Sequence, residues 1–311
     1  MAKIHRSDAP LPQTPSVQVK ASYTVTELPK VSPQEPAAFY DQDNDEDYRR
    51  RETAKCKKRR GNLLYTLAMI VFAAIFLISG GLLVKRFLDD RKTESEFADL
   101  QSMIDTAATP APAGENVNPN GARFAALRDK NSDFIGWISI DGTNLDFPVM
   151  YAPDNKDFYL RHDFNKAYSV YGVPYLDEQT TLGVNAESDN LIIYGHNMKT
   201  GTIFGCLTEY RKAGYYQEHP FIEFDTVYGD AKYEVFGAFT IDVVNDTSFI
   251  YNQYIDMDED AYNRYVDQVI SRSDVDSGIR PAYGEQLLTL STCEYSSANG
   301  RYVVVARRVS D

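Results

Sequence analysis

The pattern of apolar and polar residues divides the chain into three parts. The first part is polar and rich in proline, and it leads into one long apolar run from Leu63 to Val84. A second polar stretch follows. From about Ala122 onward, apolar residues return in short runs that alternate with polar residues. This pattern predicts one folded domain in the carboxyl-terminal part of the chain, preceded by a separate apolar segment.

The apolar segment, Leu63 to Val84, contains no charged residue. As a helix rising ~1.5 Å per residue it spans about 33 Å, which is enough to cross the hydrocarbon core of a bilayer. A cleaved signal peptide is the alternative, but the preceding tail is long and no A-x-A site follows. The positive-inside rule places the amino terminus in the cytoplasm and everything after about residue 85 outside. The basic residues that precede the segment are Lys55, Lys57, Lys58, Arg59 and Arg60.

The segments on either side of the apolar run have compositions that do not favour a core. Residues 1–62 are expected to be a disordered cytoplasmic tail, because six prolines and an acidic run lie in its first 47 residues. Residues 85–120 are expected to form an extracellular stalk and linker. Within them, Leu88–Ile104 is predicted to be helical and Thr109–Gly121 to be a linker. The folded domain is therefore predicted to cover residues 121–311.

The predicted domain is mostly β, because its apolar runs are short and rich in β-branched and aromatic residues. A short helix beginning near Ala122 precedes the strands, and a second helix over Asp256–Ser273 interrupts them. Tyr262, Tyr265, Val266, Val269 and Ile270 fall on one face of the second helix, which predicts burial of that face. A barrel or sandwich is favoured over a doubly wound sheet, and no glycine-rich phosphate loop follows a strand. The predicted strands are GWISI, LDFPVM, NLIIYGH, FIEFDTV, KYEVFGAFTIDVV, QLLTLSTC and RYVVVARRV.

Charge and cysteine content narrow the possible partners. The formal net charge of −13 gives no support to a nucleic-acid partner. The sequence has no metal-ligand cluster of the usual spacing and no calcium loop, so no cofactor is expected. Three scattered cysteines are too few for a disulfide scaffold. A disulfide between Cys206 and Cys293 remains an alternative to two free thiols.

Three residues have the chemistry that acyl transfer by cysteine requires. Cys293 ends the strand-like run TLSTC, His196 follows the run NLIIYG, and Arg301 opens the last predicted strand. Taken alone, each has an ordinary explanation, such as a buried cysteine or a solvated arginine. Together they supply a nucleophile, a proton carrier and a fixed positive donor for an oxyanion.

These residues lie in motifs that resemble those of the class B sortases. The resemblance is carried by YGHNM around His196, TLSTC ending at Cys293 and RYVVVARR beginning at Arg301, with GWISI, PVMYAPDNKDFYL and IFGCL in support. It covers about residue 121 to the carboxyl terminus. It implies a closed β-barrel of about eight strands with an amino-terminal helix and one inserted helix. It also implies that Cys293 attacks a peptide carbonyl, that His196 transfers protons and that Arg301 steadies the oxyanion.

The resemblance further implies the partners of such an enzyme. A secreted protein with a carboxyl-terminal sorting signal would be cleaved after Thr and joined to an amine of a cell-wall precursor at a Gram-positive surface. In a pilus-building sortase, the alternative, the amine is a lysine of another subunit. A membrane-tethered, non-enzymatic binding module with an inert cysteine is the third possibility. Candidate peptide contacts are Ser291, Thr292, Glu294, Tyr194 and Asn155.

Overall fold

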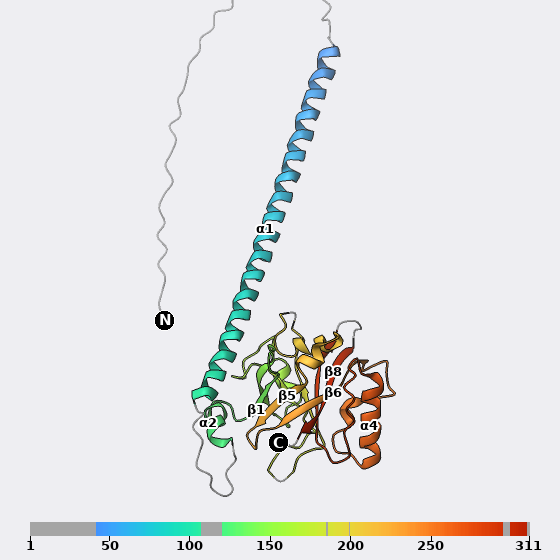
Figure 1. The fold of residues 1–311 in the computed structure, drawn as a ribbon. Coiled ribbons are helices and arrows are strands. Elements are labelled where there is room, and N and C mark those ends of the chain that lie inside the picture. Colours follow the sequence, from blue (N-terminus) through green and yellow to red (C-terminus); the bar gives the residue numbers. More distant parts are fainter. Residues whose placement is uncertain (1–41, 107–119, 185, 199, 295–298, 310–311) are drawn as a thin grey trace, which may run out of the picture. The chain divides into compact units, whose positions relative to one another are not determined.

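The computed structural model describes residues 42–106, 120–184, 186–198, 200–294 and 299–309. By its internal contacts the chain divides into two units, one ending at Leu77 and one running from Ile78 to Asp311. The second unit contains a β-barrel and the helices that pack on it (Figure 1).

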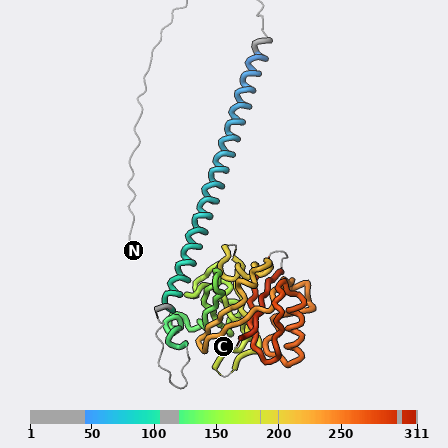
Figure 2. The backbone as a smooth tube through the Cα atoms, viewed as in Figure 1, coloured from blue at the N-terminus to red at the C-terminus, as the bar shows by residue number. Residues whose placement is uncertain are grey.

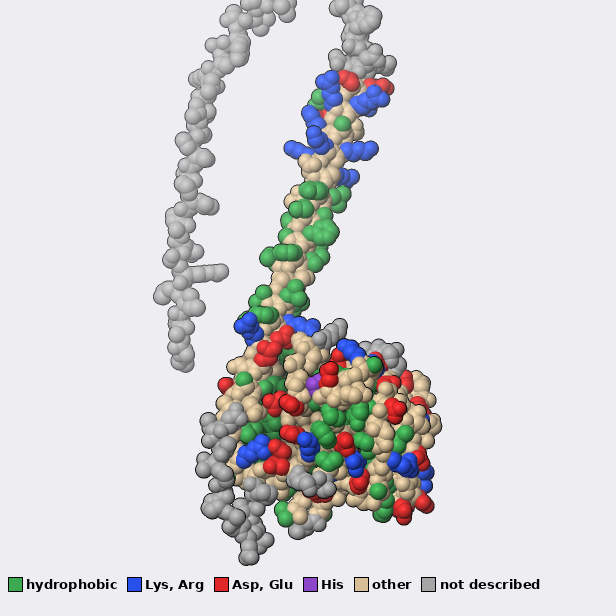
Figure 3. Space-filling model, in the orientation of Figure 1, with side chains coloured by type: hydrophobic (Ala, Val, Ile, Leu, Met, Phe, Trp, Pro, Cys, Tyr) green, Lys and Arg blue, Asp and Glu red, His purple; other side chains and the backbone are tan. Residues whose placement is uncertain are grey.

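Helix α1 (Gln42–Thr106) carries the apolar segment. Its large apolar side chains between Leu63 and Val84 are exposed, for example Phe76 at 77%. Figure 3 shows apolar side chains along this helix, with Lys and Arg gathered at both ends of the apolar stretch. Among the described residues, this helix alone is long and apolar enough to cross a membrane. Its length and composition are compatible with a single membrane span.

Helix α1 begins earlier than the sequence analysis predicts, because residues 42–62 are helical where disorder is expected. The reason is local composition. All six prolines of the tail precede residue 42, outside the described residues, whereas residues 45–60 are rich in Arg and Lys, which favour helices. Ion pairs one turn apart join Arg49 to Asp45 and Arg51 to Asp47. The predicted linker lies outside the described residues except for its last two positions.

Eight strands form a closed barrel in the order β1, β2, β3, β4, β7, β8, β6, β5. The predicted fold class, a mostly β protein with a closed barrel of about eight strands, is confirmed. Strands β2 and β3 pair only at Met150 and Tyr175, so the closure is narrowest there. The strands are β1 (Phe134–Ser139), β2 (Asp146–Met150), β3 (Tyr175–Leu176), β4 (Asn190–Tyr194), β5 (Phe221–Thr226), β6 (Lys232–Asp242), β7 (Leu287–Glu294) and β8 (Gly300–Val309).

Short helices connect and cover the strands. The short α-helices are α2 (Gly121–Lys130) and α3 (Tyr215–Glu218), and the 3₁₀ helices are η1 (Phe158–Leu160), η2 (Gly205–Arg211) and η3 (Tyr251–Gln253).

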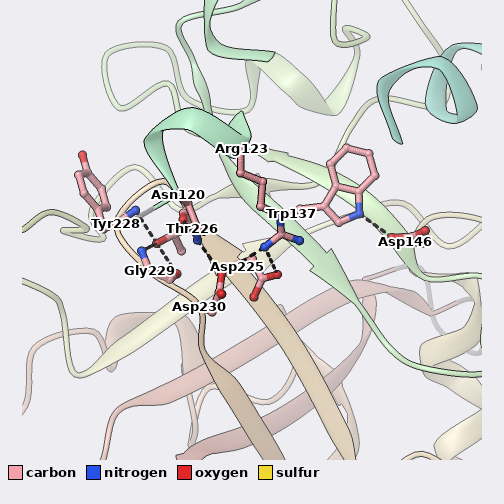
Figure 4. A network of polar contacts seen from close by, with 9 residues as sticks. All are labelled: Asn120, Arg123, Trp137, Asp146, Asp225, Thr226, Tyr228, Gly229 and Asp230. Carbon is pink, nitrogen blue, oxygen red and sulfur yellow. Dashed lines mark hydrogen bonds and ion pairs between the residues drawn. The ribbon is translucent and has the colours of Figure 1, made fainter. Parts of the chain in front are cut away.

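Polar contacts attach the start of α2 to β5 and the turn that follows it (Figure 4). The Asn120 amide nitrogen donates to the Thr226 carbonyl at 2.9 Å and to Asp230 Oδ1 at 2.6 Å. Arg123 Nη1 lies 2.8 Å from Asp225 Oδ2. Because Asn120 is buried, its amide needs these partners, and they fix where the chain enters the barrel.

The hydrophobic core includes residues that precede the predicted start of the domain. Leu100 and Ile104, near the end of α1, are 1% and 3% exposed and belong to the same cluster as the barrel interior. The Phe97 ring packs edge-on against Phe147 of β2, with 4.9 Å between centroids. The last turns of α1 are therefore part of the folded domain, although the sequence analysis assigns them to a stalk.

Helix α4 (Glu259–Arg272) covers the outside of β6 (Figures 1 and 2). Asp258 caps it by accepting a hydrogen bond from the Ala261 N–H at 2.8 Å. At Gly237 of β6 a Cβ would lie 2.4 Å from Val269 Cγ1, so the helix approaches the strand closely. Four of the five predicted face residues are buried, but Ile270 is 39% exposed. That prediction was wrong because Ile270 lies at the edge of the apolar stripe.

We expect Ile104→Ala to lower the free energy of unfolding of the domain by about 2–5 kcal/mol, because the side chain is buried in the barrel core. The matched control is Ile270→Ala, also an isoleucine on a helix but partly exposed, which should cost about 1 kcal/mol or less. Urea unfolding of the full chain in detergent, followed by tryptophan fluorescence of Trp137, measures both. Equal effects would show that the end of α1 lies outside the core.

Candidate active site

The pairing of β4, β7 and β8 brings together three residues that are far apart in the sequence. Cys293 of β7 lies directly opposite Arg301 of β8 in the antiparallel register. On the other side of β7, β4 runs parallel and Tyr194 pairs with Ser291. The pairing continues one residue further, where the Gly195 N–H donates to the Ser291 carbonyl at 3.1 Å.

This register places Cys293, His196 and Arg301 on one side of the sheet. Opposite residues on neighbouring strands have Cβ atoms about 5 Å apart, and side chains alternate along each strand. His196 lies two residues past Tyr194, as Cys293 lies two residues past Ser291. All three side chains line one cavity of about 470 Å³, whose other lining residues include Leu160, Arg161, Tyr175, Asp177, Tyr194, Tyr251, Asn252 and Ser291.

His196 is half-buried, and one of its ring nitrogens has a fixed partner. Nε2 lies 2.8 Å from the carbonyl oxygen of Leu160. A carbonyl only accepts, so Nε2 carries the proton and Nδ1 is the nitrogen that can take up another. Burial lowers the pKa of His196, the hydrogen bond to Leu160 opposes this, and the positive charge of Arg161 adds to the lowering. The imidazole is therefore mainly neutral at neutral pH.

The residues on either side of His196 are held by close contacts. A Cβ at Gly195 would lie 2.7 Å from ring carbons of Phe204, so glycine is needed for this approach. The Phe204 N–H in turn donates to the His196 carbonyl at 3.0 Å. The Asn197 side chain donates to the carbonyl of Cys293 at 2.9 Å, which ties the histidine loop to the end of β7.

A network of polar side chains lies on the same wall as the candidate nucleophile. The Tyr251 hydroxyl and Ser291 Oγ are 2.7 Å apart. The Tyr194 hydroxyl donates to Asp177 Oδ2 at 2.8 Å and accepts from Asn252 at 3.4 Å. Burial raises the pKa of Tyr194 and of Tyr251, so both stay protonated and can donate hydrogen bonds.

Of the predicted peptide contacts, Ser291, Thr292 and Tyr194 line the cavity, whereas Glu294 and Asn155 do not. Thr292 is 1% exposed and its hydroxyl donates to the Gly195 carbonyl at 2.7 Å. Glu294 forms an ion pair with Arg211 at 3.3 Å. The sequence analysis missed Asp177, Tyr251 and Asn252, because no local motif marks residues that only the folded barrel brings to the cavity.

Both cysteines of the domain are free thiols, so the disulfide alternative is wrong. Cys206 is buried, and this burial raises the pKa of its thiol to about 11. Cys293 is partly exposed at the cavity. Cys293 is therefore the cysteine of the domain that a peptide can reach. Among the described residues, no group of three or more His, Cys, Asp or Glu side chains is arranged to hold a metal ion.

Comparison with known proteins finds similar chains over the whole barrel. The family model described as Sortase domain matches residues 138–309. Sortase B of Staphylococcus aureus is 30% identical over 244 residues, covering 78% of this chain and 95% of the relative. Sortase B of Listeria monocytogenes is 27% identical over 247 residues, with the same two coverages. The solved Staphylococcus aureus sortase B-substrate complex has a TM-score of 0.62 at 29% identity, covering 72% of this chain and 99% of that chain.

We expect Gly195→Ala to push the histidine loop away from Phe204, because the added methyl group has no room. The variant should lose about 1–3 kcal/mol of stability, and the pKa of His196 should rise toward the ordinary value of about 6.5 as the ring becomes wetter. Histidine NMR titration and urea unfolding measure these two effects. Gly183→Ala is the control, since the atom nearest to its Cβ lies 3.8 Å away. An unchanged His196 pKa in Gly195→Ala would contradict the packing argument.

Proposed function

The chain belongs to the class B sortases, which are cysteine transpeptidases, and we propose that it anchors secreted proteins to the cell wall. In this proposal it cleaves a carboxyl-terminal sorting signal after Thr and transfers the new carbonyl end to an amine of a cell-wall precursor. The observation that carries the proposal is the strand register that brings Cys293, His196 and Arg301 to one cavity. A relative, sortase B of Staphylococcus aureus, has been solved as a complex with its substrate, which supports substrate binding by the same fold.

The first half of the proposed reaction forms a thioester. Cys293 Sγ bonds to the carbonyl carbon of the scissile peptide bond, and the thiol proton passes to Nδ1 of His196. The carbonyl oxygen becomes an oxyanion. When the C–N bond breaks, His196 returns the proton to the leaving amine. The lowered pKa of His196 suits this step, because the imidazole begins in the neutral form that accepts a proton.

In the second half the thioester is resolved by the incoming amine. The amine nitrogen bonds to the carbonyl carbon and loses a proton to His196, and the C–S bond then breaks. The sulfur recovers a proton from His196, so the enzyme is restored. Arg301 remains charged at any working pH, so its part is to stabilise the oxyanion and position the peptide rather than to transfer protons.

The peptide contacts follow from the cavity lining. We propose that Ser291 and Tyr194 contact the sorting signal, together with Tyr251, because all three line the cavity that contains Cys293. The alternative acceptor, a lysine of a pilin subunit in a pilus-building sortase, uses the same thioester. A panel of glycine, diamino acid and lysine peptides as acceptors, with the product identified by mass spectrometry, distinguishes the two.

The proposed location is the cell membrane, with the amino terminus in the cytoplasm and the catalytic domain outside. The basic cluster before the apolar segment of α1 supports this orientation. A protease added to intact, wall-stripped cells should digest the domain and leave an epitope at the amino terminus. Loss of that epitope while the domain stays intact would indicate the opposite orientation.

The test of the proposed function compares two cysteine variants of the full chain. Cys293→Ala should abolish cleavage of sorting peptides and the covalent intermediate, a loss of roughly 10³ or more. Cys206→Ala should keep most activity and lower stability, because that side chain is buried. Peptide cleavage and intact-protein mass spectrometry measure both. Cleavage retained by Cys293→Ala would exclude the mechanism.

The same assay separates the parts of His196 and Arg301. Arg301→Lys keeps the charge but loses the planar fork, so activity should fall roughly 10²-fold while the bell-shaped pH dependence remains. His196→Ala should flatten that dependence. In the wild type, the acidic limb should lie below about pH 6.5, because the pKa of His196 is lowered. A fully active Arg301→Lys would remove Arg301 from the proposed role.

A further inference from the structure

We propose that the part of α1 beyond the apolar segment positions His196 for catalysis, with Asp90 and Phe97 as the positioning residues. The inference rests on the proposed function and adds to it a role for residues outside the predicted catalytic domain. Asp90 contacts Tyr171, whose neighbour Gly172 packs on the Leu160 carbonyl, and Phe97 lines a small cavity with Ile203 of the loop that follows His196. None of the predicted site residues lies on this helix.

The first contact reaches the carbonyl that holds the imidazole. The Tyr171 hydroxyl donates to Asp90 Oδ1, and Tyr171 is only 7% exposed. The next residue, Gly172, packs its backbone on η1: a Cβ there would lie 2.8 Å from the carbonyl oxygen of Leu160. That oxygen accepts the hydrogen bond from His196 Nε2 at 2.8 Å. The position of α1 therefore affects where the Leu160 carbonyl lies, and this carbonyl sets the tautomer and orientation of His196.

The second contact reaches the loop that follows His196. A small apolar cavity of about 160 Å³ is lined by Phe97 of α1 together with Phe147, Thr202 and Ile203. Ile203 is 1% exposed and has a φ of 57°, an unfavourable conformation for a β-branched residue. It pairs with Asn197, whose side chain donates to the Cys293 carbonyl. Strain of this kind persists where surrounding packing holds it, and Phe97 is part of that packing.

The two contacts together explain why a helix outside the barrel affects the chemistry. A catalytic group must be held close to its productive geometry by neighbours that are themselves fixed. If α1 moves away, the Leu160 carbonyl and the Ile203 loop both lose a support, and water gains access to the imidazole. The proposed peptide contacts Ser291, Tyr194 and Tyr251 lie on β7, β4 and η3, not on η1 or in the loop that follows His196. The effect should therefore fall on kcat more than on KM.

The experiment uses the full chain in detergent micelles, with three single variants. Phe97→Ala removes the ring, Phe97→Leu restores an apolar side chain, and Tyr171→Phe deletes only the hydrogen bond to Asp90. Leu100→Ala is the control, because Leu100 is buried on the same helix but does not line the small cavity. For each protein, kcat, KM and the pH dependence of peptide cleavage are measured below the temperature at which it unfolds.

We expect Phe97→Ala to lower kcat about tenfold with KM within twofold, and to move the acidic limb to higher pH because His196 becomes less buried. Phe97→Leu should recover most of kcat, and Tyr171→Phe should shift the limb in the same direction by a smaller amount. Leu100→Ala should lose stability but keep the wild-type limb. The inference would be overturned if both Phe97→Ala and Tyr171→Phe kept the kcat and the acidic limb of the wild type. It would also be overturned if Leu100→Ala shifted the acidic limb as much as Phe97→Ala does.

A second readout separates this inference from the proposed function. Alkylation of Cys293 by iodoacetamide, followed on its tryptic peptide across pH, reports on the surroundings of the thiol without any substrate. If the wild type cleaved no sorting peptide, the proposed function would fail. The inference would still be tested, because Phe97→Ala should change the pH dependence of alkylation and Leu100→Ala should not. An unchanged dependence in Phe97→Ala would overturn it.

Discussion

The site depends on the hydrogen-bonded pairing of three neighbouring strands, β4, β7 and β8. The central strand, β7, ends in Cys293 and pairs parallel with one neighbour and antiparallel with the other. Because side chains alternate along a strand, a slip of one residue in either pairing would turn His196 or Arg301 to the opposite side of the sheet. The buried residues of β7 and β8 resist such a slip, because alternate side chains pack in two different clusters and a slip would move each of them out of the cluster it fills. The packing of the barrel therefore keeps Cys293, His196 and Arg301 on the same side of the sheet.

Burial shifts the pKa values of several groups that this pairing brings together. The imidazole of His196 is half-buried beside Arg161, and both conditions favour its neutral form. The tyrosines on the cavity wall keep their protons for the same reason, and so they remain hydrogen-bond donors. Arg301 stays charged. In the proposed mechanism, the cavity therefore combines one group that exchanges protons, His196, with several that only donate hydrogen bonds or stabilise charge.

The packing of α1 on the barrel changes where the catalytic domain begins. Leu100 and Ile104 fill part of the core, and Phe97 contacts β2. The same helix carries the apolar segment. The turns that pack on the barrel follow this segment in sequence. A protein that begins at residue 121 would lack these side chains and would leave their binding surface open to water.

Much of the fold class and the three candidate catalytic residues could be predicted from the sequence. Short β-branched runs predict a barrel or a sandwich because strand periodicity is a local property. The closed barrel and the three catalytic candidates follow from short motifs that resemble those of the class B sortases. Tyr251, Asp177 and Asn252 could not be found this way, because they reach the cavity only through strand pairing and loops distant in sequence. The core role of Leu100 and Ile104 was hidden for a related reason. An amphipathic helix shows which face is apolar but not what covers it, and that choice is made when the barrel closes.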